Sequence, residues 1–119
     1  MNNQETFDTA ARHLLTQKGT SRVTPNGTCA YRGEDGLKCA VGCLIPDPAY
    51  TYEMEGLGVD ALFERFPDME ELFADVDTNL LVRLQTVHDS VSVGFWRQCL
   101  EDIAGAYGLS TAVLHEEYP

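Results

Sequence analysis

The densest group of chemically versatile side chains lies in residues 29–47. This stretch contains three of the four cysteines of the chain, together with Arg32, Lys38 and a turn, Gly33-Glu34-Asp35-Gly36. Thiolates bind metals or act as nucleophiles, and cations beside a glycine-bounded turn bind anions. The stretch therefore matches three kinds of site in its residue types.

Zinc is the first of these. Cys29, Cys39 and Cys43 provide three thiols, and His88 or His13 a ring nitrogen, for the tetrahedral coordination that zinc adopts. Structural zinc sites usually contain two pairs of ligands separated by about two to four residues, whereas only Cys39 and Cys43 are close here. The spacing therefore predicts no metal site. The apolar neighbours of Cys43 and Cys99 favour small buried side chains.

The second is a nucleophilic cysteine. Lys38 precedes Cys39 and would lower the pKa of its thiol, while His88-Asp89 offers a base beside a carboxylate. Adjacent residues of a helix point about 100° apart, so Asp89 is not expected to orient the His88 imidazole. We instead expect His88 at the edge of a core face and Asp89 in water. No catalytic residue is predicted.

The third is recognition of a small anion. The glycines of the 33–36 turn would let backbone N–H groups approach a phosphate, which the fork of Arg32 could clamp. A base could stack on an aromatic ring, for which the candidates are Tyr31, Tyr50, Tyr52 and Trp96. Alternatively, the cations pair with Glu34, Asp35 or the acidic helices. The predicted ligand-binding residues are Tyr31, Arg32, Lys38, His88 and Asp89.

The elements that would position these residues are mainly helices. Residues 4–17 place apolar side chains on one stripe, ended by Gly19. Four further helices are predicted: 59–66, ended by Pro67; 69–76, capped by Asp68; 79–91, capped by Asp77 or Thr78; and 94–107, followed by Gly108. A last short helix would follow Ser110.

A small β-hairpin is predicted near residues 28–41. Its arms are residues 28–32 and 37–41, on either side of the 33–36 turn, after a loop over residues 19–28. Alternatively, residues 38–45 form a short buried helix closed by Pro46. The predicted fold class is a mainly α helical bundle, with 1–119 as a single globular domain.

Charge is distributed unevenly along the chain. Residues 1–50 contain five cations and five anions, whereas residues 51–119 contain three cations and fourteen anions and so carry the whole net charge of −11. This balance disfavours direct binding to nucleic acid, whose affinity depends on neutralised phosphates. An acidic surface instead either solvates the protein or mimics nucleic acid toward a basic partner.

The length and the N-terminal sequence limit the cellular compartment that is expected for the protein. A chain of 119 residues can bury a hydrophobic core without a metal or disulfides. Its start resembles no export signal, and no long apolar run predicts a membrane span. We therefore expect a cytoplasmic protein with reduced thiols, no cofactor and no membrane contact.

A resemblance is carried by several short motifs. The motifs are Tyr31-Arg32-Gly33, Gly36, Lys38-Cys39-Ala40-Val41-Gly42 and Leu44-Ile45-Pro46-Asp47, followed by Met54-Glu55-Gly56, Leu84-Gln85 and Val87-His88-Asp89. Together they resemble a family of small uncharacterised proteins from phages and bacteria. It covers most of the chain. The resemblance implies a role in defeating host defences by sequestering nucleotide signals or blocking effectors, and fixes no residue's role.

Three functions follow as predictions. The first is a non-catalytic cytosolic binding protein, in the form of a phage-type anti-defence sponge for a small anionic or nucleotide-like signal. The second is an acidic protein inhibitor that binds a protein partner by nucleic-acid-like surface mimicry. The third is a cysteine-dependent enzyme. The sequence is also compatible with a homo-oligomer.

Overall fold

The computed structural model describes residues 1–23 and 28–118. Its α-helices are α1 (Asn3–Gln17), α2 (Val59–Arg65), α3 (Pro67–Leu72), α4 (Thr78–Ser90) and α5 (Trp96–Tyr107). Two short strands, β1 (Arg22–Val23) and β2 (Thr28–Cys29), form the sheet of the described chain. The mainly α class is therefore confirmed. No helix in the described chain has both the length and the hydropathy needed to cross a bilayer.

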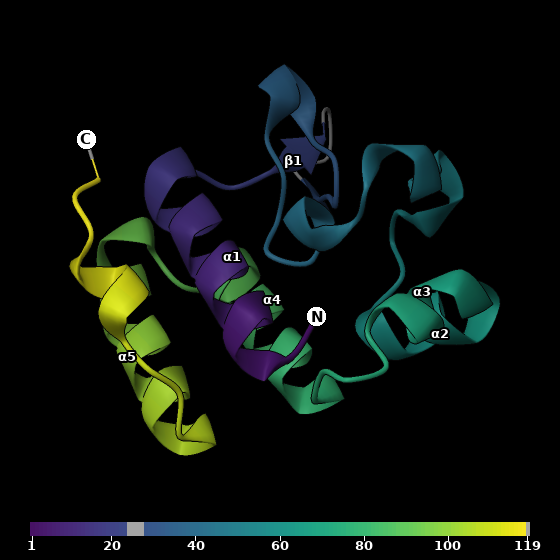
Figure 1. The fold of residues 1–119 in the computed structure, drawn as a ribbon. Coiled ribbons are helices and arrows are strands. Elements are labelled where there is room, and N and C mark those ends of the chain that lie inside the picture. The colour runs from purple at the N-terminus through teal and green to yellow at the C-terminus, as the bar shows by residue number, and fades with distance from the viewer. Residues whose placement is uncertain (24–27, 119) are drawn as a thin grey trace.

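Helices α1, α4 and α5 pack together and carry about half of the apolar core (Figure 1). The α1 helix begins with a capping box, in which Asn2 and Glu5 exchange side-chain and backbone hydrogen bonds. Its predicted apolar stripe is buried. The helix ends at Gln17, as predicted, but the residue that adopts the left-handed conformation after it is Lys18, with φ of 54°, and not Gly19.

The boundaries of α4 and α5 follow their capping residues. Asp77 caps α4, and its carboxylate accepts the Asn79 backbone N–H at 2.8 Å. Gly108 ends α5 with φ of 63°, a conformation that glycine adopts at little cost. After this cap, residues 112–115 form a single 3₁₀ turn, and Ser110 accepts the Ala112 N–H. The predicted helices are therefore present, although α4 begins and ends one residue before its predicted bounds, α5 begins at Trp96 and not at residue 94, and Thr111 is the N-cap of the last turn.

Pro67 begins α3 instead of only ending α2. Proline is favoured in the first turn of a helix because its missing N–H has no partner to lose there. As a result, α3 runs from Pro67 to Leu72, and Asp68 lies inside its first turn instead of capping it. Helices α2 and α3 pack against each other on the side of the molecule away from α5 (Figure 1).

The predicted hairpin near residues 28–41 is wrong. Thr28–Cys29 pairs instead with Arg22–Val23, in antiparallel register. The two predicted arms share one isolated bridge, Arg32 to Lys38, closed by the Gly33 N–H to the Leu37 carbonyl at 2.8 Å. The second arm turns away into a 3₁₀ turn at Gly42–Leu44, close to the alternative of a short buried helix before Pro46.

The segment after β2 is held by side chains of the helices and not by a sheet. Gln17 of α1 both donates to the Lys38 carbonyl and accepts the Lys38 N–H. His13 also donates to this carbonyl, at 2.8 Å. On the other side, Gln85 of α4 accepts the Val41 N–H. These contacts fix residues 38–42 between α1 and α4, which places Tyr31 opposite Asp89.

Candidate functional site

The predicted site residues separate into two groups. Tyr31 and Asp89 line one cavity, whereas Arg32 and Lys38 lie together on Asp47. His88 is fully buried beside Asp89 and does not line that cavity.

Arg32 is held by the neighbouring loop through both terminal nitrogens, whereas its buried Nε has no hydrogen-bond partner among the described residues. Its terminal nitrogens donate to the Asp47 carboxylate at 2.7 Å and to the Ile45 carbonyl at 2.8 Å. Its guanidinium also lies 4.8 Å from the centre of the Tyr50 ring, as in a cation–π contact. Such an arginine holds the 45–50 loop and has no free fork for a phosphate.

Lys38 shares the same carboxylate partner. Its Nζ lies 3.8 Å from Oδ1 of Asp47, so both predicted cations of the anion site face one anion. Arg32 and Lys38 therefore form their ion pairs with Asp47. They do not pair with Glu34 or Asp35 of the turn that connects them. The remaining positive charge is small for an anion site in a strongly acidic protein.

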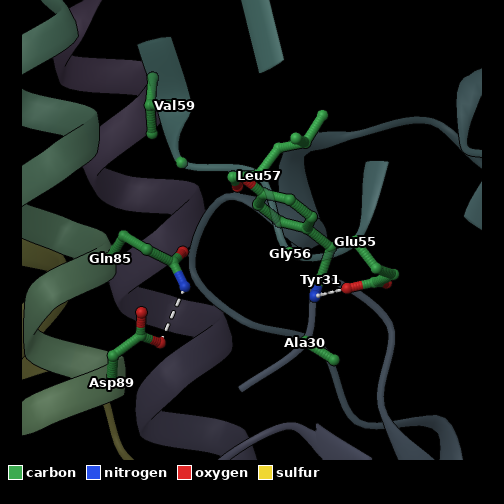
Figure 2. A pocket seen from close by; sticks show the side chains of 9 residues that line it. Ala30, Tyr31, Glu55, Gly56, Leu57, Val59, Gln85 and Asp89 are labelled. Atoms are coloured by element: carbon green, nitrogen blue, oxygen red, sulfur yellow. Dashed lines mark hydrogen bonds between the residues drawn. The ribbon is translucent and has the colours of Figure 1, made fainter. Parts of the chain in front are cut away.

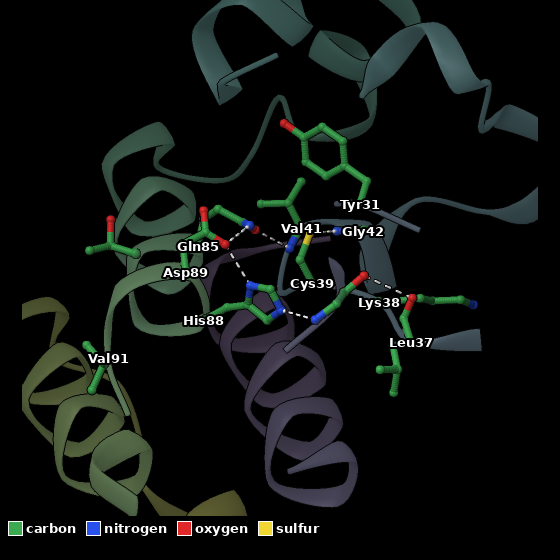
Figure 3. A network of polar contacts seen from close by, with 12 residues as sticks. Tyr31, Leu37, Lys38, Cys39, Val41, Gly42, Gln85, His88, Asp89 and Val91 are labelled. Atoms are coloured by element: carbon green, nitrogen blue, oxygen red, sulfur yellow. Dashed lines mark hydrogen bonds and ion pairs between the residues drawn. The ribbon is translucent and has the colours of Figure 1, made fainter. Parts of the chain in front are cut away.

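A chain of polar contacts runs from Ser21, just before β1, to the 38–42 segment (Figure 3). Nε2 of His88 accepts the Ser21 backbone N–H at 2.8 Å, and Nδ1 lies 2.6 Å from Oδ1 of Asp89. Since Nε2 is the acceptor, Nδ1 carries the proton and donates to Asp89. Gln85 donates to the same carboxylate oxygen at 2.9 Å. Every polar atom of the buried imidazole is therefore satisfied.

The expectation that Asp89 cannot orient His88 is wrong. Although the two side chains leave the helix in different directions, they meet because the His88 ring turns its Nδ1 edge toward the following residue. The pair looks like a catalytic dyad, but the nitrogen that would take a proton already accepts the Ser21 N–H. Its observed contacts join Ser21, the residue before β1, to α4.

The Tyr31/Asp89 pocket is a cavity of about 310 Å³, seen in Figure 2. The Tyr31 ring forms one side, Gln85 and Asp89 of α4 form another, and the backbone at Gly56 and Gly58 contributes to the wall. The Tyr31 hydroxyl donates to the Leu57 carbonyl, which fixes the ring. The volume lies at the lower end of the range of about 300–1,000 Å³ for small-molecule sites.

The pocket has acidic and aromatic walls and no Lys or Arg among its lining residues in the described chain. Glu55 is occupied, because its two oxygens accept the backbone N–H groups of Tyr31 and Arg32 as well as the Tyr50 hydroxyl. Asp89 uses only Oδ1 toward the described residues. Burial raises the pKa of the Tyr31 hydroxyl, so this wall is a neutral phenol at physiological pH.

Sequence reasoning missed Glu55, Gln85 and the Gly56–Gly58 backbone. The i, i+4 spacing of Gln85 and Asp89 places them on one helix face and was the available signal for that pair. Nothing local indicates Glu55, because it reaches the 31–32 backbone from more than twenty residues away. Of the proposed stacking rings, Tyr52 is exposed, while Trp96 is buried and donates to the Val91 carbonyl.

Cys39, Cys43 and Cys99 pack in or against the hydrophobic core. Cys39 is fully buried, and its sulfur accepts the Gly42 N–H at 3.2 Å. Burial raises the pKa of the Cys39 thiol to about 12, opposite to the lowering expected from Lys38. Burial also raises the Cys43 pKa to about 12. In the described part of the chain, no three His, Cys, Asp or Glu side chains are grouped as metal ligands; the side chain of Cys29 lies outside the described residues.

Comparisons of the chain with protein-family models, with curated protein sequences and with solved structures give no match. The resemblance to small phage and bacterial proteins therefore stays a prediction.

Proposed function

We propose that this protein is a non-catalytic binding protein that holds the nucleoside part of a small molecule in the Tyr31/Asp89 pocket. The observation that carries the proposal is the position of Asp89 across the pocket from the Tyr31 ring (Figure 2). A flat base or sugar would pack on the ring, and its N–H or O–H groups would donate to Oδ2 of Asp89.

The electrostatics of the pocket narrow the ligand. With Asp89 and Glu55 in its walls, the cavity favours neutral or cationic groups that donate hydrogen bonds over a phosphate. Its volume of about 310 Å³ suits one nucleoside better than a dinucleotide. A nucleotide-derived signal would therefore enter with its nucleoside end and leave its phosphates in solvent. Sequestration of such a defence signal remains part of the proposal.

The engaged state of Cys39 and His88, the candidate nucleophile and base among the described residues, supports binding over catalysis. Cys39 is buried with a raised thiol pKa, and His88 has both nitrogens in hydrogen bonds. In the described chain, Asp89 is the pocket carboxylate with a free oxygen, and its other oxygen serves His88 and Gln85. One carboxylate held in this way can recognise a donor.

Isothermal titration calorimetry against free nucleosides, ADP-ribose, a cyclic dinucleotide and inorganic phosphate tests the proposal. We expect a nucleoside-bearing ligand to bind and phosphate alone not to bind. Asp89→Asn should weaken the binding about tenfold or more, because a charged hydrogen-bond acceptor becomes neutral. This change also alters the His88 contact, so a second variant is needed.

Gly58→Leu is that variant. Gly58 lines the pocket and a Cβ on it meets nothing within 4 Å, so a leucine fits locally and adds bulk at the pocket wall. It should abolish binding while the protein stays folded by circular dichroism. Gly58→Ser is the matched control, because serine preserves the N-cap of α2 and fills little space. The proposal would be contradicted if none of the tested ligands bound, or if inorganic phosphate bound and Arg32→Ala removed that binding.

A further inference from the structure

A second cavity lies on the opposite part of the fold from α5. This α2/α3 groove has a volume of about 440 Å³, and its lining includes Phe63 of α2, Glu70 and Glu71 of α3, and Phe73 and Ala74 just after α3. It shares no residue with the Tyr31/Asp89 pocket. The function proposed above does not use it.

The floor of the groove is aromatic. The rings of Phe63 and Phe73 stack with centroids 5.6 Å apart and planes inclined at 28°. Phe73 belongs to the core, while Phe63 is only partly buried and Ala74 is exposed. An apolar side chain of suitable size could therefore rest on the stacked rings without displacing the core.

The rim of the groove is acidic. Glu70 and Glu71 are exposed in its wall, and Glu64 of α2, Asp68 of α3 and Asp75 after α3 are also exposed. No ion pair joins these carboxylates to any cation of the described chain. Residues 59–77 contain seven carboxylates and a single cation, Arg65. The rim thus gives the groove a negative electrostatic potential around an apolar floor.

We propose that the α2/α3 groove docks a basic segment of another protein, in which one apolar side chain is flanked by lysines or arginines. Charge complementarity selects this occupant, because acidic walls attract cations while the phenylalanine floor needs an apolar anchor. A nucleic acid is repelled by the walls. A second copy of this chain also fits poorly, since each copy carries a net charge of −11 and contains no basic run.

This surface differs from the charge-only mimicry expected from composition. A mimic of nucleic acid would work through the spacing of its carboxylates, whereas the groove adds a pocket for one side chain. The difference can be measured with a labelled short peptide in which one leucine is flanked by arginines and lysines. A second peptide replaces that leucine by serine and keeps every charge.

Fluorescence anisotropy against the whole protein gives the test. We expect the leucine peptide to bind, and to bind about tenfold more tightly than the serine peptide. Ala74→Trp should remove this preference by filling the groove without changing any charge. Glu70→Lys combined with Glu71→Lys should weaken binding about tenfold or more.

The matched control is Glu53→Lys combined with Glu117→Lys, two exposed positions outside the groove that change the net charge equally. This control should bind nearly as well as the unmodified protein. Equal binding of both peptides, with equal losses in the two double variants, would overturn the proposal and leave only general attraction to an acidic protein. No binding of the leucine peptide would also overturn it.

Discussion

His13 lies half-buried where α1 meets the 38–42 segment. Its Nε2–H donates to the Lys38 carbonyl at 2.8 Å. Burial lowers the pKa of His13 below its ordinary value of 6.5, and the positive charge of Lys38 adds to the lowering. The folded protein therefore resists protonation of His13, whereas the unfolded chain accepts it. Between the two pKa values the unfolded state binds more protons, so the free energy of unfolding rises with pH.

We expect the protein to lose stability as the pH falls below about 6.5, and His13→Gln to reduce this loss, because glutamine keeps an N–H donor but does not titrate. Urea unfolding followed by circular dichroism between about pH 7.5 and 5.5 measures the difference. His115→Gln, at an exposed position, is the control for the loss of a histidine. Parallel pH profiles for the unmodified protein and His13→Gln would contradict this assignment.

The site could be predicted only in part from its residue types. Tyr31 and Asp89 are in the predicted set and line the pocket, but Arg32 and Lys38 leave it because Asp47 binds both. Sequence gives the charge of each side chain and not its partner. Glu55, which fixes the backbone of residues 31 and 32, lies too far along the chain for any local pattern to connect it with them.

At the scale of elements, the close approach of the Gly42–Leu44 turn to Tyr31 shapes the pocket. A Cβ on Gly42 would lie 2.1 Å from the Tyr31 carbonyl oxygen, a backbone atom that cannot rotate away. The same turn is tied to α4 through the Val41 N–H and Gln85. Glycine at this position therefore allows the 38–42 segment to pack between Tyr31 and α4.

Gly42→Ala should destabilise the protein by about 1–3 kcal/mol, because the methyl group must push two backbone segments apart. The matched control is Gly105→Ala inside α5, where a Cβ meets nothing within 4 Å. That change should stabilise the protein by about 0.5–1 kcal/mol, since alanine is the better helix former. Urea midpoints measure both changes. A Gly42→Ala variant as stable as the unmodified protein would show that the approach is not tight.

The helices were predictable because their signals are local. The α1 stripe, the Asp77 cap and the Gly108 stop each act within a few residues of the boundary they set. The hairpin was not predictable in this way. Strand pairing depends on which segment reaches Thr28–Cys29, and Arg22–Val23 takes that place while the Lys38 backbone is held by Gln17 of α1.

At the scale of the whole molecule, the net charge is concentrated in one part of the chain, whereas both parts contribute to the core. The first fifty residues are neutral and supply α1 and most of the 30–58 segment around the pocket. The later residues carry the net charge of −11 on exposed carboxylates, including those around the α2/α3 groove. Folding brings these charges closer together, so the folded state bears more mutual repulsion than the extended chain.

Added salt should therefore stabilise the protein. Raising the ionic strength from about 0.01 M to about 0.15 M shortens the screening length from roughly 30 Å to roughly 8 Å. Exposed ion pairs such as Arg12–Glu116 weaken under the same change, but such pairs contribute little, so the loss of repulsion dominates. Each screened repulsion of about 1 kcal/mol raises Tm by about 4 °C in a chain of this size.

Combining Glu70→Lys with Glu71→Lys relieves part of the repulsion in advance, so the rise in Tm measured by calorimetry should be smaller in that variant. A Tm that falls with salt, or that rises equally in the unmodified protein and the double variant, would mean that repulsion among the carboxylates around the groove does not destabilise the fold.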